Sequence, residues 1–288
     1  MMVITIKNLF LQLSKQTVLD DLNLEIEAGE ICCILGKNGA GKTSLFKCIL
    51  GGVQPDSGEI FIDGIPMNIT NRIKILNSIG VLFDLSIAYE HLSVWDNLRI
   101  IAKLYDIEDT NTCEQMLVFF GLENDRHKLV RHLSSGMSQR LGLAMSNVHN
   151  PKILLLDEPT NALDPQAVIE FRYLMKQLNK NKNTTILYNT HNLDEAQRVS
   201  NRIVILKDGI IIFDSKIQKI ENFIIIEFKK EDSSGNVGSK DDFYEKDGHL
   251  YKLYDLQNPK NSIAIVADIS HRKATIEDIY LAKHHAIL

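Results

Sequence analysis

The apolar residues of this chain follow two patterns that alternate along the sequence. Short continuous apolar runs lie at residues 31–36, 78–83, 152–159 and 184–191. Runs of this length are typical of parallel strands that are covered on both faces. Residues 41–51 and 166–180 instead place apolar residues at helical spacing. The alternation predicts an α/β fold with a doubly covered sheet, whose ligands lie at the carboxyl ends of its strands.

Other segments complete a mixed architecture. Residues 3–9, 22–36, 57–64 and 201–214 predict strands separated by turns. From about residue 93 to 150, apolar residues recur at three- and four-residue spacing, which predicts a helical insertion that Pro151 ends.

The motifs stop after about Asp214, and the pattern changes again. Apolar stretches at 222–230, 249–256 and 262–269 predict three strands, with the polar stretch 231–242 between the first two. Thr275 and Asp278 fit a capping box for a last helix. We expect a large domain over residues 1–215, with a helical subdomain at about 86–150, and a small C-terminal α+β domain over residues 216–288.

Composition narrows the class of protein. The net charge of −5 gives no indication of a nucleic-acid partner. The chain has no apolar stretch of roughly 20 residues, and its start lacks the features of a signal peptide. The four cysteines show no CxxC spacing and are interpreted as reduced core thiols of a cytosolic protein.

A glycine-rich loop predicts a phosphate site. Residues 36–43, GKNGAGKT, match the pattern G-x-x-x-x-G-K-[ST] and lie between a predicted strand and a predicted helix. Backbone N–H groups of such a loop, and the positive end of the helix, bind phosphate. Lys42 is expected at the terminal phosphates of a nucleotide, and Thr43 at Mg²⁺. The residues predicted to bind the nucleotide are Gly36, Lys37, Asn38, Gly39, Ala40, Gly41, Lys42, Thr43 and Ser44.

An acidic pair ends the buried run at 152–159. Adjacent strand residues point in opposite directions, so the carboxylates of Asp157 and Glu158 are expected to diverge. This allows two roles, with Asp157 supporting Mg²⁺ and Glu158 activating a water aimed at the γ-phosphate.

Taken together, the motifs resemble those of the ATP-binding cassette family, the nucleotide-binding subunits of ABC transporters. LSSGMSQR at 133–140 resembles the family signature, NALD at 161–164 resembles its D-loop, and His191 resembles its switch histidine. The resemblance covers roughly residues 2–214 and implies a P-loop NTPase cassette with a mixed sheet, an antiparallel β part and a helical subdomain. It also implies that the nucleotide at residues 36–44 is ATP, and that Glu158 and His191 are catalytic. The ATP held by one cassette would be contacted by residues of a second cassette, namely Ser134, Ser135, Gly136, Met137 and Asp164.

The chain departs from the family pattern at three positions. Leu13, or Phe10 if the alignment shifts, stands where the family stacks an aromatic residue on adenine, so we expect weaker and less base-selective ATP binding. Asp84 stands where the family has a glutamine at Mg²⁺. Asp84, Met137 and the ending TIEDIYL resemble cassettes that confer self-protection against lantibiotics and bacitracin-like peptides.

The resemblance implies the ATPase subunit of an exporter at the cytoplasmic face of the membrane. Its partners would be a second cassette and a membrane permease that docks near Asp84 and residues 88–98. The cargo would be a peptide antibiotic, a drug or a lipid. Two alternatives are a soluble cassette ATPase acting on ribosomes or DNA, and a regulatory nucleotide-binding protein. The single cassette and acidic charge argue against the first, and intact Lys42, Glu158 and His191 against the second.

Overall fold

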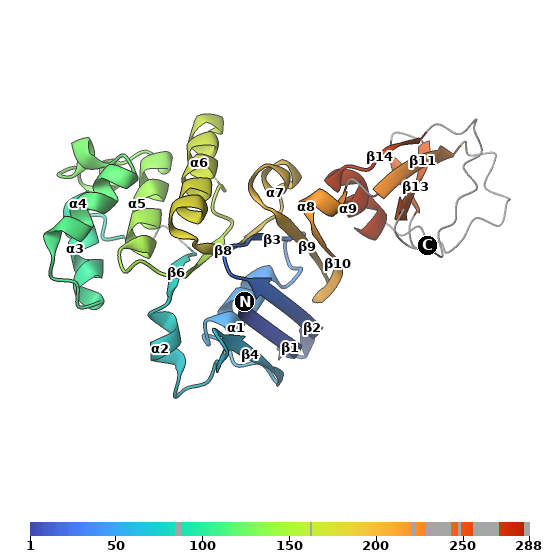
Figure 1. Cartoon of the computed structure of the whole chain (residues 1–288), viewed down its shortest axis with the longest axis horizontal. Helices are drawn as coiled ribbons and strands as arrows, with labels where there is room; N and C mark the ends of the chain where they lie inside the picture. Colours follow the sequence, from blue (N-terminus) through green and yellow to red (C-terminus); the bar gives the residue numbers. More distant parts are fainter. Residues whose placement is uncertain are drawn as a thin grey trace.

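A six-stranded mixed sheet forms the centre of the fold (Figure 1). The computed structural model describes residues 1–83, 88–161, 163–220, 223–228, 243–246, 249–255 and 271–284. In spatial order, the strands of the central sheet are β10 (Ile210–Lys216), β9 (Arg202–Lys207), β3 (Ile31–Leu35), β8 (Thr185–Thr190), β7 (Ile153–Asp157) and β6 (Ile79–Leu82). β10 pairs antiparallel with β9, and the other pairs are parallel.

The central sheet is buried on both faces, as its continuous apolar runs predicted. In β3, Cys32 and Ile34 point into one hydrophobic core, whereas Ile31, Cys33 and Leu35 point into the other. The thiols of Cys32 and Cys33 are free and buried, in agreement with their interpretation as core residues.

A second, antiparallel sheet lies below the central one in Figure 1, and α1 (Lys42–Ile49) packs between the two sheets. Its strands are, in spatial order, β2 (Gln16–Glu27), β1 (Met2–Leu13), β4 (Ser57–Ile62) and β5 (Ile65–Pro66). Leu45 and Phe46 of α1 share one core with Ile4 and Ile6 of β1. This core fixes the helix that follows the glycine-rich loop.

The predicted helical insertion is present and lies at one end of the molecule in Figure 1. The other helices described before residue 216 are α2 (Arg72–Leu76), α3 (Val94–Leu104), α4 (Thr110–Phe119), the 3-10 turns η2 (Glu123–Asp125) and η3 (Val130–His132), α5 (Ser135–Asn147), α6 (Pro165–Lys182) and α7 (Leu193–Val199). Ser93 caps α3 in a capping box with Asp96. Within the described ranges, no helix combines the length and apolar character needed to cross a bilayer.

The C-terminal segment forms a third sheet and a last helix. Its elements are α8 (Ile217–Ile220), β11 (Phe223–Phe228), β12 (Phe243–Lys246), β13 (His249–Asp255), β14 (His271–Lys273) and α9 (Ile276–His284). The strands predicted at 222–230 and 249–256 are β11 and β13, whereas β12 and β14 were not predicted. The strand predicted at 262–269 lies outside the described residues.

The last helix packs into one of the two hydrophobic cores. The predicted capping box is confirmed, because the Thr275 N–H donates to Asp278 Oδ2 at 2.8 Å and the Asp278 N–H donates to Thr275 Oγ1 at 3.2 Å. Ile276 and Ile279 of α9 belong to the same core as Ala196 of α7. The division of the chain at residue 215 stays a prediction.

The close approach of α5 to β6 generates a stability prediction. A Cβ at Gly80 would lie 2.1 Å from the carbonyl oxygen of Ser146 and 2.6 Å from Leu154 Cδ2. We expect Gly80→Ala to lower the free energy of unfolding by about 1–3 kcal/mol, because a packed core cannot accept the added methyl without a backbone shift. Urea unfolding of the full chain measures it. Gly52→Ala is the matched control, since its Cβ would meet its nearest neighbour at 3.5 Å. An equal loss in both variants would contradict the prediction.

Candidate functional site

The glycine-rich loop connects β3 to α1 at the carboxyl edge of the central sheet. Gly41, with φ of 103°, directly precedes the first residue of the helix. Gly39 has φ of 86° and no atom within 4 Å of an added Cβ, so its backbone is accessible. The first N–H groups of a helix have no acceptor within the helix, and its dipole favours an anion there. The loop therefore fits a phosphate.

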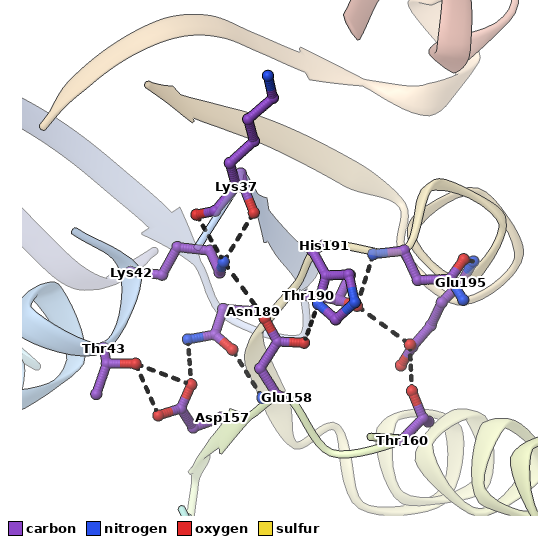
Figure 2. Close-up of polar contacts among 12 residues, drawn as sticks. Lys37, Lys42, Thr43, Asp157, Glu158, Thr160, Asn189, Thr190, His191 and Glu195 are labelled. Atoms are coloured by element: carbon purple, nitrogen blue, oxygen red, sulfur yellow. Dashed lines mark hydrogen bonds and ion pairs between the residues drawn. The ribbon is translucent and has the colours of Figure 1, made fainter. Parts of the chain in front are cut away.

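Lys42 is buried in this loop and its ammonium group is held in place. Its Nζ donates to the carbonyl oxygens of Gly36 at 2.7 Å and Lys37 at 3.2 Å. The same Nζ lies 3.3 Å from Glu158 Oε1 (Figure 2). The positive charge thus lies between the loop and the acidic pair.

The two carboxylates of the acidic pair diverge, as predicted. Asp157 ends β7 and accepts a hydrogen bond from the Thr43 hydroxyl at 3.0 Å. Glu158 has φ of 47°, an unusual conformation for a residue other than glycine. This turn directs Glu158 Oε2 to within 2.8 Å of His191 Nδ1 (Figure 2). Asp157 therefore faces the magnesium candidate Thr43, and Glu158 faces Lys42 and His191.

Two further buried polar residues lie at this carboxyl edge of the central sheet, and their role was not predicted from the sequence. Asn189 of β8 contacts both acidic residues. Glu195 of α7 is fully buried, accepts hydrogen bonds from the hydroxyls of Thr160 and Thr190, and has a pKa raised by burial. Asn189 could have been recognised from the sequence, because it is an amide at the end of a continuous apolar run and a buried amide requires hydrogen-bond partners.

The signature residues lie at the start of another helix. Ser134 caps α5, and its hydroxyl accepts a hydrogen bond from the N–H of Met137 at 3.3 Å. Ser135 and Gly136 are therefore in the first turn of α5, as predicted. Asp164 caps α6 by accepting from the N–H of Ala167 at 3.0 Å.

A cavity of about 440 Å³ opens over the glycine-rich loop. It is lined by Gln16, Thr17, Val18, Asn38, Gly39, Gly41, Lys42, Thr43, Ser44, Glu158 and Asp208. Ser134–Met137 are not among these lining residues, so the structure does not bring the signature to its own glycine-rich loop.

The structure describes only some of the residues that were expected to alter the binding of ATP and Mg²⁺. Leu13 ends β1, is 43% exposed, and pairs with Gln16 at the rim of the cavity. The alternative Phe10 lies further from the hairpin turn and pairs with Ser57. Asp84 lies outside the described residues, so its expected place at Mg²⁺ stays a prediction.

Known proteins are similar to this chain in sequence and in fold. The sequence profile of the family described as ABC transporter matches residues 19–161. The chain is 34% identical to the bacitracin transport ATP-binding protein BcrA of Bacillus licheniformis, over 83% of this chain and 78% of that protein. It is 32% identical to the lantibiotic transport ATP-binding protein SrtF of Streptococcus pyogenes, over 76% of this chain and 93% of that protein.

A solved structure resembles the chain as well. The dimeric ATP-binding cassette MJ0796, bound to ADP and Pi in a post-hydrolysis state, matches with a TM-score of 0.66 and 27% identity, over 74% of this chain and 98% of that one. The predicted P-loop cassette fold is thereby confirmed.

The place of Leu13 beside the cavity rim generates a prediction for base binding. We expect Leu13→Tyr to tighten ATP binding about 5-fold or more, because a base stacked on an aromatic ring gains about 1–3 kcal/mol. Titration with a fluorescent ATP analogue measures the dissociation constant. Leu13→Val, which adds no ring, should bind ATP like the native chain. If Leu13→Tyr leaves the affinity unchanged, the base does not contact this position.

Proposed function

Because the chain belongs to the family of ABC transporter ATP-binding proteins and is therefore an ATPase, we propose that it energises a membrane permease that exports a peptide antibiotic of the bacitracin or lantibiotic class. The proposed cargo class rests on the similarity of this chain to transport proteins for these peptides, which extends over at least 76% of this chain. Met137 and Asp84 agree with the same branch. The proposed location is the cytoplasmic face of the membrane.

The two carboxylates of the acidic pair have different roles in the proposed hydrolysis. The Thr43 hydroxyl and the Asp157 carboxylate would hold Mg²⁺, because they are hard oxygen ligands and this ion usually takes few protein ligands besides the substrate phosphates. The bound ion would neutralise charge that develops on the phosphates. Glu158 accepts the proton of the attacking water, and its contact with His191 holds its carboxylate in orientation.

A second cassette completes each ATP site in this proposal. The start of α5, with Ser134, Ser135, Gly136 and Met137, is a helix N-terminus that lies outside the cavity of its own chain. Such a helix end favours an anion, and the second subunit provides one as bound ATP. Asp164 lies at the same kind of helix start in α6 and would contact the partner cassette. The dimeric state of the similar cassette MJ0796 supports this arrangement.

The permease is proposed to dock in a groove between the central sheet and the helical insertion. A cavity of about 800 Å³ lies there, lined by residues of α2, β6, α3 and α5. Ile73 and Leu104 line it and are 77% and 73% exposed, which is unusual for large apolar side chains. Ala88 and Glu90, in the segment predicted for docking, also line this groove.

The proposed base generates a test of the catalytic assignment. We expect Glu158→Gln to lower the turnover number for ATP at least about 100-fold, because a positioned general base contributes about 10²–10⁴ in rate. The amide keeps the size of the side chain, so nucleotide binding should persist. Phosphate release by the full chain, alone and with its permease, measures the rate. Glu59→Gln, an exposed glutamate of β4, is the control. Native turnover in Glu158→Gln would refute the assignment.

The exposed apolar rim generates a test of docking. We expect Ile73→Glu to reduce co-purification with the permease about 10-fold or more, because a charge would be buried on docking. Ile169→Glu is the matched control, since Ile169 is 58% exposed on α6, does not line the groove and is not in the proposed ATP site. ATP binding by each variant verifies its fold. Equal co-purification of both variants with the permease would place the docking surface elsewhere.

A further inference from the structure

We propose that Asn189 is a positioning residue for ATP hydrolysis, because its one amide group holds the backbone of Glu158 and the carboxylate of Asp157 at the same time (Figure 2). The inference rests on the proposed function, in which Asp157 serves Mg²⁺ and Glu158 accepts a proton. It adds a third residue on which both roles depend.

Both ends of the Asn189 side chain are used by the acidic pair. Its Oδ1 accepts the N–H of Glu158 at 2.7 Å, and its Nδ2 donates to Asp157 Oδ1 at 2.6 Å. The parallel register of β7 and β8 places Asn189 directly opposite Asp157. Since Asn189 is fully buried, water does not compete for these hydrogen bonds.

The backbone of Glu158 needs such support. Its φ of 47° lies in the left-handed region, which is unfavourable for a residue with a Cβ. The hydrogen bond from its N–H to Asn189 stabilises this turn, and the turn directs the carboxylate toward Lys42 and His191. Without the acceptor, a part-buried N–H would lose its partner and an extended backbone would be favoured.

The environment of Asn189 argues against a purely packing role. The preceding residues of the strand, Ile186, Leu187 and Tyr188, are fully buried and mainly apolar. An apolar side chain would satisfy this position without any hydrogen bond, whereas an amide must be paired at both ends. The pairing goes to the two residues that carry the proposed chemistry.

Asn189→Ser tests hydrogen bonding against packing. Its hydroxyl can donate to Asp157 or accept from the N–H of Glu158, whereas the leucine of Asn189→Leu can do neither. Leucine fills the volume of the amide better than serine, so a role in packing alone predicts the higher kcat for Asn189→Leu. We expect the opposite order, with the kcat of Asn189→Ser about 3-fold or more above that of Asn189→Leu and below that of the native chain, because part of the hydrogen bonding to the acidic pair is retained. Steady-state ATP hydrolysis at one fixed pH measures both values.

Asn189→Leu tests both ends together at similar volume. We expect its kcat to fall about 10-fold or more while the KM for ATP changes less than about 3-fold, because positioning acts on turnover rather than on substrate binding. Thermal unfolding verifies the fold of each variant. Tyr188→Phe is the matched control, because it removes a buried hydroxyl of the same strand that bonds Ser200 and the backbone carbonyl of Glu195 and does not contact the acidic pair. Its kcat should stay within about 2-fold of the native value.

Glu158→Gln, measured beside these variants, distinguishes a failure of the proposed function from a failure of the positioning role of Asn189. If it keeps native turnover, the proposed function fails. If it is inactive while Asn189→Ser turns over no faster than Asn189→Leu, or while Asn189→Leu keeps the native kcat, only the positioning role fails. If the Asn189→Leu chain does not fold, Asn189→Ser decides, since a native kcat in that variant would overturn the positioning role.

Discussion

The parallel pairing of β3, β8 and β7 in one register is the constraint on which the site depends. Leu35 pairs with Thr190, and Asn189 pairs with Asp157, so the glycine-rich loop, His191 and the acidic pair leave the sheet at the same edge. A slip by one residue would exchange the faces of every side chain. Because both faces of these strands are buried in apolar cores, such a slip is opposed by the packing of the whole sheet.

The carboxyl edge of the central sheet contains a buried charge and an unfavourable backbone conformation, neither of which stabilises the fold. The Lys42 ammonium is buried, and Glu158 adopts a backbone conformation that few residues with a Cβ accept. Each is held by specific neighbours: backbone carbonyls for Lys42, and the amide of Asn189 for Glu158. The stability of the core offsets the cost of these local arrangements, as is common at functional sites.

The sequence predicted the sheet and the phosphate loop because both depend on local patterns. Apolar runs identified β7 and β8, and GKNGAGKT identified the loop before α1. The contact between Lys42 and Glu158 could not be read this way, since it depends on the φ of Glu158 and on an amide from another strand. β12 and β14 were missed because strands of four and three residues carry too short an alternation.

One short helix connects the catalytic edge to the C-terminal segment. α7 begins two residues after His191, and its Glu195 receives hydrogen bonds from Thr160 and Thr190, which follow the acidic pair and precede the histidine. On its other side, Ala196 and Val199 share a core with Ile276 and Ile279 of α9. A buried carboxylate with two partners resists displacement, because moving it would leave polar atoms unpaired. The loops after β7 and β8 are therefore coupled to each other, and α9 restrains the helix that couples them.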